Sequence, residues 1–291
     1  MKGLLNICLV LFLTLFQTAY AGSCFKDKDA DDCRVKSEQG IPDSQYNLGK
    51  MYYKGLGVPQ DYKEAAKWTR LAAKQGHAKA QYNLGVMFER GQGVLQDYKE
   101  AVKWYRLAAE QGIPKAQYNL GNKYRKGKGV DQDYKEAVKW IRLAAEQGED
   151  EAQSSLGYRY HDGTGVPQDY KEAVKWYRLA AEQGNSSAQY NLGVMYGKGH
   201  GVVQDYKAAV KWYRLAVEQG HASAQNNLGV MYYKGLGVPK DYVIAHMYFK
   251  IAAVSGDKVA IENRSIVEWK MTDSQVAEAE KLAREWMRTH Q

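Results

Sequence analysis

The six histidines are the first residues to examine for chemistry, because imidazole is a common metal ligand and general base. They are His77, His161, His200, His221, His246 and His290. No two of them have the H-x-x-x-H spacing that places two imidazoles on one helix face around a zinc ion. The histidine pattern therefore predicts no metal site.

Motifs for covalent or phosphate chemistry are also lacking. The chain has no G-x-S-x-G sequence, the turn that presents a nucleophilic serine in many hydrolases. Paired glycines recur from Gly55/Gly57 to Gly235/Gly237, but they join two predicted helices. A phosphate-binding glycine loop needs a strand before it. We therefore expect no enzyme activity and no cofactor.

The N-terminal residues have the layout of a secretory signal peptide. Lys2 supplies a positive charge, residues 7–16 form an apolar run, and Ala19-Tyr20-Ala21 has the small-x-small pattern of a cleavage site. We predict cleavage after Ala21 and a periplasmic or secreted protein. Two alternatives stay open, an uncleaved membrane anchor and a lipoprotein with its lipid on Cys24. No transmembrane span is expected in the mature chain.

Cysteine usage agrees with export. Cys8 leaves with the signal, so the mature chain would keep only Cys24 and Cys33. An even number of closely spaced cysteines in an oxidising compartment indicates a disulfide, here between Cys24 and Cys33.

An acidic run lies between these two cysteines. Residues 27–32 read DKDADD, with Glu38 eleven residues after Asp27, a spacing similar to that of a calcium loop. The sixth loop position requires glycine for a sharp turn, and Asp32 stands there. We interpret the run as a solvated acidic segment.

Composition narrows the class of protein. Of the 291 residues, 45% are hydrophobic and 25% are charged, which is enough to build a core and unlike a disordered chain. A mean hydropathy of −0.60 excludes a protein with many membrane spans. The formal net charge of +8 is spread along the chain rather than gathered in a tail. That distribution and the predicted export argue against nucleic-acid binding.

A strict 36-residue repeat organises most of the chain. Six copies begin at Ser44, Ala80, Ala116, Ala152, Ala188 and Ala224, without an insertion. Five of them share the line A/S-Q-x-x-L-G-…-G-x-G-V-x-Q-D-Y-K-x-A-x-K-W-x-R-L-A-x-x-Q-G, and the sixth diverges. A period of this length predicts a solenoid, in which each copy buries its apolar face against its neighbours.

Each copy reads as two helices, A and B. In the second copy, helix A is expected from about Ala80 to Arg90 and to stop at Gly91, a left-handed C-terminal glycine. Asp97 should cap helix B, and Glu100 three residues later predicts a reciprocal capping box. The same pair recurs at 61/64, 133/136 and 169/172. The glutamate is replaced by Ala208 and Ile244 in the last two copies, so their B helices should have weaker N-terminal caps.

Apolar spacing predicts which residues form the core of the second copy. Ala80, Leu84 and Phe88 are four residues apart on helix A. On helix B the expected stripe is Tyr98, Ala101, Trp104, Leu107 and Ala108. Tryptophan repeats at one position, Trp68, Trp104, Trp140, Trp176 and Trp212, and we interpret it as packing rather than ligand stacking. The position of His77 and His221 holds Ile113, Glu149 or Asn185 in other copies, which indicates a tolerant surface site.

The repeated pattern A-x-x-x-L-G…G-x-G-V…D-x-x-x-A-x-x-W-x-x-x-A-A-x-x-G resembles the Sel-one-like repeat family, relatives of the tetratricopeptide repeats. The resemblance covers residues 44–259, and the last residues resemble the family's terminal cap, with Thr272 or Asp273 opening a helix over 275–290. It implies an all-α, right-handed α-solenoid superhelix of six helix-turn-helix repeats with a C-terminal capping helix. The expected segments are a signal peptide (1–21), a disulfide segment with a half repeat (22–43), repeats at 44–79, 80–115, 116–151, 152–187, 188–223 and 224–259, and cap helices (260–291).

The resemblance also implies a function. Proteins of this family serve as scaffolds for protein complexes, so we expect an exported scaffold that binds a peptide or protein in the concave groove. A cysteine-rich branch has been linked to β-lactam binding or weak hydrolysis, but its repeats carry disulfides and these repeats contain no cysteine. An envelope glycan-binding or β-lactam-binding protein with weak β-lactamase activity is the alternative function. The oligomeric state stays open.

Two repeated positions on helix A form a candidate binding flank. By resemblance, the A helices line the concave groove, where asparagine amides could bond an extended peptide and cations could favour acidic segments. An alternative is that the asparagines bridge adjacent helices while the cations form a solvated rim. The flank consists of Asn47, Asn83, Asn119, Asn191 and Asn227 with Lys54, Arg90, Lys126, Lys198 and Lys234, while the fourth copy has Ser155 and Asp162.

Overall fold

A computed structural model describes residues 30–290. The predicted signal peptide, Cys24 and the first half of the acidic run lie outside these residues. Cys33 is fully buried in the first described helix, and its bond to Cys24 stays a prediction. The chain forms two compact units, one ending at Ala144 and the other beginning at Ala145, and each is described by itself.

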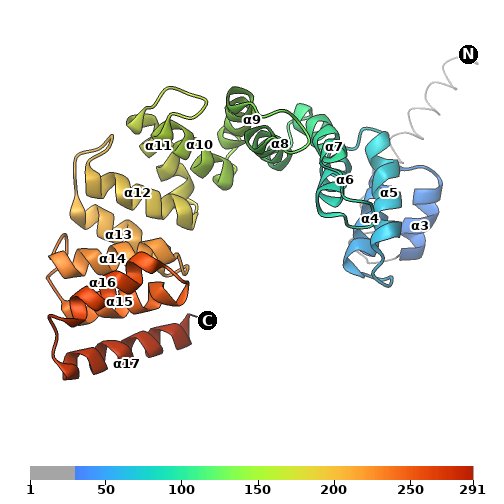
Figure 1. Cartoon of the computed structure of the whole chain (residues 1–291). Coiled ribbons are helices and arrows are strands. Elements are labelled where there is room, and N and C mark those ends of the chain that lie inside the picture. The colour runs from blue at the N-terminus through green and yellow to red at the C-terminus, as the bar shows by residue number, and fades with distance from the viewer. Residues whose placement is uncertain (1–29, 291) are drawn as a thin grey trace, which may run out of the picture. The chain divides into compact units, whose positions relative to one another are not determined.

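The first unit consists of antiparallel helices stacked in chain order (Figure 1). Its helices are α3 (Ala30–Glu38), α4 (Pro42–Lys54), α5 (Tyr62–Lys74), α6 (Ala78–Arg90), α7 (Tyr98–Glu110), α8 (Pro114–Lys126) and α9 (Tyr134–Glu146), the last of which runs past Ala144. Each helix from α3 to α7 packs against the next. The A helices of this unit are α4, α6 and α8, and its B helices are α5, α7 and α9.

The second unit repeats this arrangement and adds two terminal helices. Its A helices are α10 (Asp150–Asp162), α12 (Ser186–Lys198) and α14 (Ala222–Lys234), and its B helices are α11 (Tyr170–Glu182), α13 (Tyr206–Val217) and α15 (Tyr242–Val254). The chain then continues into α16 (Lys258–Glu268) and α17 (Asp273–Thr289), both of which pack against α15. The predicted all-α repeat solenoid is confirmed. In the described part of the chain, no helix is both long and apolar enough to cross a membrane.

Helix boundaries follow the predicted signals, with one correction. Each A helix ends at a glycine with positive φ, such as Gly91 at +68°. The Asp97 carboxylate accepts hydrogen bonds from the backbone N–H groups of Lys99 and Glu100, and so caps α7. The capping box also predicts a bond from the glutamate carboxylate, three residues later, back to the backbone N–H of the aspartate. This part of the prediction is wrong, because the carboxylate points forward along the helix. In α5 the Glu64 carboxylate accepts from Trp68 Nε1 at 3.1 Å.

The last two B helices begin with fewer capping bonds, as expected. The carboxylates of Asp205 and Asp241 each accept one backbone N–H, from Ala208 and Ile244, where the earlier caps accept two. A reciprocal capping box does occur at the start of α17, between Thr272 and Gln275.

The position shared by His77 and His221 is the N-cap of an A helix, and it tolerates Ile113 and Glu149, which make no side-chain capping bond. His77 Nδ1 accepts a hydrogen bond from the Ala80 backbone N–H at 3.1 Å, and His221 Nδ1 accepts from Ala224 at 3.3 Å. Asn185 caps α12 in the same way. Imidazole can do this only while Nδ1 is unprotonated.

We expect the cap at His221 to fail in acid. Burial lowers the pKa of His221 below its ordinary 6.5, so the folded chain disfavours its protonation. Stability from this residue is therefore complete above pH 6.5 and is lost as pH falls through the lower, folded-state pKa. His221→Asn, which copies Asn185, should leave stability near neutrality unchanged and reduce its loss in acid. Thermal unfolding followed by circular dichroism across this pH range checks the difference, and parallel curves for the two proteins would contradict it.

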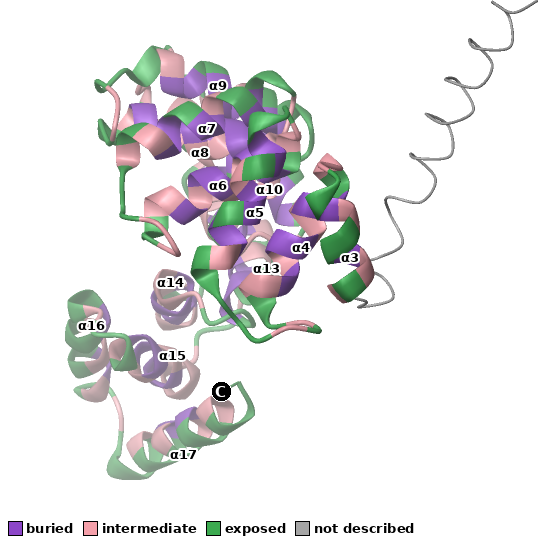
Figure 2. Cartoon of the chain, turned by 90° about the vertical axis from the view of Figure 1, so that its right-hand side faces the viewer, coloured by how far each residue is buried: buried purple, intermediate pink, exposed green. Residues whose placement is uncertain are grey.

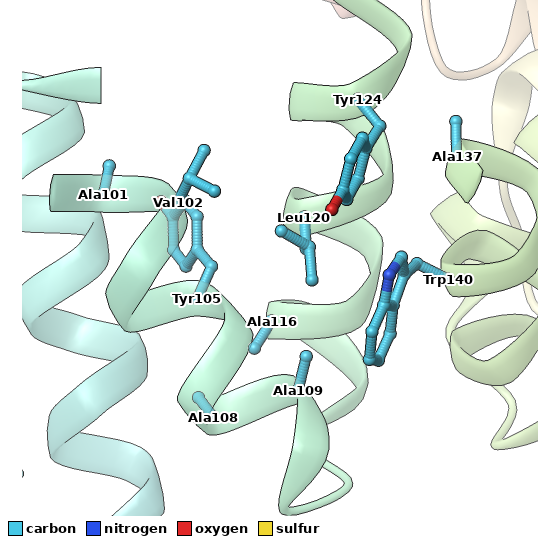
Figure 3. Packing of buried hydrophobic residues seen from close by; sticks show 10 residues of the cluster. All are labelled: Ala101, Val102, Tyr105, Ala108, Ala109, Ala116, Leu120, Tyr124, Ala137 and Trp140. Carbon is cyan, nitrogen blue, oxygen red and sulfur yellow. The ribbon is translucent and has the colours of Figure 1, made fainter. Parts of the chain in front are cut away.

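Buried and exposed residues alternate along the helices seen in Figure 2, and the buried ones form the core. Figure 3 shows one cluster, in which Leu120 of α8 lies between Tyr105 of α7 and Trp140 of α9. Trp68, Trp104, Trp140 and Trp176 are all buried, which supports a packing role. The predicted stripe on helix B needs one correction. Leu107 is 37% exposed, and Tyr105 takes its place in the core at 0% exposed.

The second glycine of four G-x-G pairs lies against the backbone of the preceding copy. Gly93 has φ +71°, and a Cβ built there would lie 1.8 Å from the backbone oxygen of Tyr62 at the start of the preceding B helix. Gly129, Gly201 and Gly237 make the same approach to Tyr98, Tyr170 and Tyr206. Only a residue without a side chain allows these backbones so close together.

Buried glutamines join successive copies. Gln81 Nε2 donates to the backbone oxygen of Ala73, and its Oε1 accepts from Gln111 Nε2 at 2.7 Å. Gln111 Nε2 also lies 3.0 Å from the backbone oxygen of Gly76. The same arrangement recurs at Gln45/Gln75 and Gln153/Gln183. These bonds explain why glutamine recurs at two positions of the repeat, since a buried amide must find partners.

Candidate partner-binding flank of the A helices

The structure places the predicted binding residues at two levels of the A helices. The asparagines (Asn47, Asn83, Asn119, Asn191 and Asn227) are half-buried near the middle of α4, α6, α8, α12 and α14. The cations (Lys54, Arg90, Lys126, Lys198 and Lys234) are exposed at the last residue of the same helices. We call these ten residues the A-helix flank. In α10 the cation is replaced by exposed Asp162.

Several flank asparagines bond tyrosines of neighbouring helices. Asn227 Nδ2 donates to Tyr213 Oη at 3.3 Å. Burial raises the pKa of Tyr46, and a hydrogen bond with Asn83 partly offsets that rise. Tyr105 similarly bonds Asn119. Part of the amides' hydrogen-bonding capacity therefore joins adjacent helices, in line with the bridging alternative.

The flank cations form no salt bridges among the described residues. Within residues 30–290, none of the five forms an ion pair with a carboxylate. One lysine in each of the first four B helices differs. Lys67, for example, pairs with Glu64 at 3.1 Å, one helical turn away. The positive field of the A-helix flank is thus available to an outside anion.

A cavity of about 390 Å³ opens beside the flank in the first unit. Its wall comes from α4, α5 and α6, so it spans two successive copies. The lining residues are Tyr46, Gly49, Lys50, Tyr53, Lys54, Thr69, Tyr82, Asn83, Val86, Met87 and Arg90. Three of them, Lys54, Asn83 and Arg90, belong to the predicted flank, and the structure brings these three together around one cavity.

The electrostatics of this cavity favour a negative ligand. Burial lowers the pKa of Lys50, and the nearby charges of Lys54 and Lys79 lower it further. The Lys50 ammonium also lies 5.4 Å from the centre of the Tyr46 ring. An anion bound here would relieve the mutual repulsion of these cations.

Sequence reasoning missed Lys50, Tyr46, Tyr53 and Tyr82. A usable signal for the first of these was present in the sequence. The position of Lys50 holds Val86, Asn122, Tyr158, Val194 and Val230 in the other copies, so it varies although it lies between constant positions such as Leu48 and Gly55. Constant positions reveal the scaffold, whereas a position that varies between copies can distinguish one binding site from another.

A half-buried ion pair joins the second and third A helices. Lys123 is 5% exposed, and its ammonium bonds the Glu89 carboxylate of α6. Tyr105 Oη donates to the second oxygen of Glu89 at 2.6 Å. Burial alone would raise the pKa of Glu89, but the bonds from Lys123 and Tyr105 lower it. Burial and the neighbouring carboxylate raise the pKa of Tyr105.

No group of three or more His, Cys, Asp or Glu residues among those described could hold a metal ion. The structure does bring His161 and His200 together, with ring centroids 6.4 Å apart. Burial and the positive charges of His200 and Lys198 lower the pKa of His161.

Comparison with known proteins identifies the repeat. The model of the Sel1 repeat matches six consecutive segments, 42–77, 78–113, 114–149, 150–185, 186–221 and 222–257. These segments have the 36-residue period found in the sequence, displaced by two residues from the boundaries inferred there. A search of curated proteins found no match.

Two solved structures share both sequence and fold with this chain. One is c5321, a protective antigen of uropathogenic Escherichia coli with an SLR fold, at 38% identity and a TM-score of 0.79. The match covers 89% of this chain and 56% of that one, so this chain spans little more than half its length. The other is a Sel1 repeat protein from Oxalobacter formigenes, at 35% identity and a TM-score of 0.68, covering 84% and 95% of the two chains.

Proposed function

This chain belongs to the Sel1 repeat family, and we propose that it is an exported, non-enzymatic scaffold that binds acidic segments of a partner protein along its A-helix flank. Sel1 repeat proteins generally mediate protein–protein interactions. The proposal of export rests on the signal-like residues 1–21 and on Cys24 and Cys33.

The observation that carries the proposal is the positive charge gathered beside the cavity of the first unit. Lys50, Lys54 and Arg90 line one space together with the Asn83 amide. Amide donors can bond a peptide backbone, and clustered cations attract carboxylates and speed their encounter. Tyrosine rings in the same wall offer apolar area to the stems of bound side chains.

Reversal of three flank cations tests this proposal. The variant Arg90→Glu, Lys126→Glu, Lys198→Glu should bind a labelled peptide rich in Asp and Glu at least about tenfold more weakly, because attraction becomes repulsion. Fluorescence anisotropy measures the affinity, and circular dichroism should show an unchanged helical signal, since all three residues are exposed.

A matched control removes the effect of overall charge. Lys63→Glu, Lys99→Glu, Lys171→Glu changes three exposed lysines of the B helices and alters the net charge by the same amount. It should weaken binding far less than the flank variant. Equal losses in the two variants would show that the peptide senses only net charge, and the flank would not be the site.

A further inference from the structure

One of the first five B helices lacks a glutamate that the others use to neutralise a lysine. In the first four copies, Glu64, Glu100, Glu136 and Glu172 pair with the lysine three residues later, at 3.1, 3.4, 3.2 and 3.3 Å. In α13 of the fifth copy the glutamate is replaced by Ala208, and the lysine is retained as Lys211. No carboxylate of the described residues pairs with Lys211. Its ammonium lies 5.8 Å from the centre of the Trp212 ring.

A groove runs beside this changed helix. It has a volume of about 490 Å³ and lies between α13 and the loop of the sixth copy. Its lining is Lys207, Val210, Lys211, Arg214, Leu215, Glu218, Gly237 and Val238. The three cations are spaced at i, i+4 and i+7 and so share one face of α13. The one carboxylate in the lining, Glu218, is already engaged by His290 Nε2 at 3.1 Å.

A hollow of about 660 Å³ with polar and apolar lining continues this groove. The two spaces share Lys207 and Gly237. The hollow is lined by Tyr196, Val202, Val203, Gln204, Asp205 and Tyr206 in addition. Val203 is 88% exposed, and Leu215 in the groove is 41% exposed. The combined furrow, defined by these two linings, therefore has a basic end and an end with exposed apolar side chains, where the Asp205 carboxylate accepts the Ala208 backbone N–H as the cap of α13.

We propose that this furrow is a second docking site, distinct from the A-helix flank, for a protein segment that carries acidic side chains next to apolar ones. Charge complementarity selects the acidic side chains, because the loss of glutamate at position 208 leaves Lys211 uncompensated beside Lys207. Burial of Val203 and Leu215 on docking favours apolar side chains. The site is specific to the fifth copy, since copies one to four neutralise the equivalent lysine.

The substitution Ala208→Glu tests the proposal by restoring the residue of the other copies. It should weaken binding of a labelled peptide of Glu-Glu-Leu repeats about tenfold, because the new carboxylate pairs with Lys211 and repels the peptide. Folding should be retained, since glutamate in the first turn favours a helix. Anisotropy gives the affinity, and hydrogen exchange of the full chain should show peptide-induced protection over 206–217 that Ala208→Glu removes.

Further variants separate the parts of the proposal. Leu215→Ser should weaken the Glu-Glu-Leu peptide several-fold while leaving a Glu-Glu-Ser peptide unaffected. The flank variant with Arg90, Lys126 and Lys198 reversed should still show protection over 206–217. Unchanged affinity of Ala208→Glu, or protection confined to α4 and α6, would overturn the furrow and leave the flank intact. Equal binding of the two peptides would overturn the apolar part.

Discussion

The substitution Gly93→Ala is expected to lower the free energy of unfolding by about 3 kcal/mol or more. Two effects add. An L residue loses roughly 1–2 kcal/mol on adopting left-handed φ, and Gly93 has φ +71°. Forcing a methyl group into a packed site costs a further 1–3 kcal/mol or so, and here the Cβ would lie 1.8 Å from the Tyr62 oxygen. Because that oxygen belongs to backbone, a side-chain rotation cannot relieve the clash.

Gly112→Ala separates these two effects. Gly112 also has positive φ, +83°, but a Cβ there would meet nothing within 4 Å. It should therefore cost only the conformational part, roughly 1–2 kcal/mol. Urea unfolding followed by circular dichroism compares the two variants. If both lose the same stability, the close approach of Gly93 to the preceding copy does not determine the spacing of the repeats.

Local signals in the sequence were enough to predict the helices. The boundaries of α6 and α7 depend on Gly91 and Asp97, which act on their own helix, and the 36-residue period repeats them. The functions of Gly93 and Gln81 were not predictable in this way, because their partners, Tyr62 and Gln111, belong to neighbouring copies. A repeated residue shows that a contact exists, but its partner becomes known only in three dimensions.

The errors have the same origin. Leu107 and Tyr105 are both apolar residues near the predicted stripe of α7, and only the direction of the neighbouring helix decides that Tyr105 is buried. The Glu64 carboxylate has two possible donors, the backbone N–H of Asp61 and the indole N–H of Trp68. It accepts from the indole of Trp68, which packing holds in place. At the candidate site, the flank cations were predicted from their constancy, whereas Lys50 occurs in one copy and escaped notice.

The second large effect is expected at the buried pair Glu89–Lys123. Glu89→Gln should lower the free energy of unfolding by about 2 kcal/mol, because it leaves the Lys123 ammonium buried without a counter-charge. This value is below the about 3–5 kcal/mol typical of a fully buried pair, since the Glu89 side chain is 34% exposed. Protonation of Glu89 in acid should also lower the free energy of unfolding. The pKa of Glu89 is lowered from 4.5, so its contribution is complete above pH 4.5 and is lost as pH falls through the folded-state pKa.

The other copies supply the variant that separates a charge effect from a packing effect. Methionine occupies the position of Lys123 in four copies, as Met51, Met87, Met195 and Met231. Lys123→Met should therefore cost less than about 1 kcal/mol, because Glu89 keeps the Tyr105 hydroxyl and partial access to water. Glu89→Gln combined with Lys123→Met should recover most of the loss, because no buried charge is then left alone. Urea unfolding of the four proteins completes the cycle. Additive losses would mean that Glu89 and Lys123 contribute independently, and the pair would then not explain why lysine is tolerated at a position that holds methionine in four other copies.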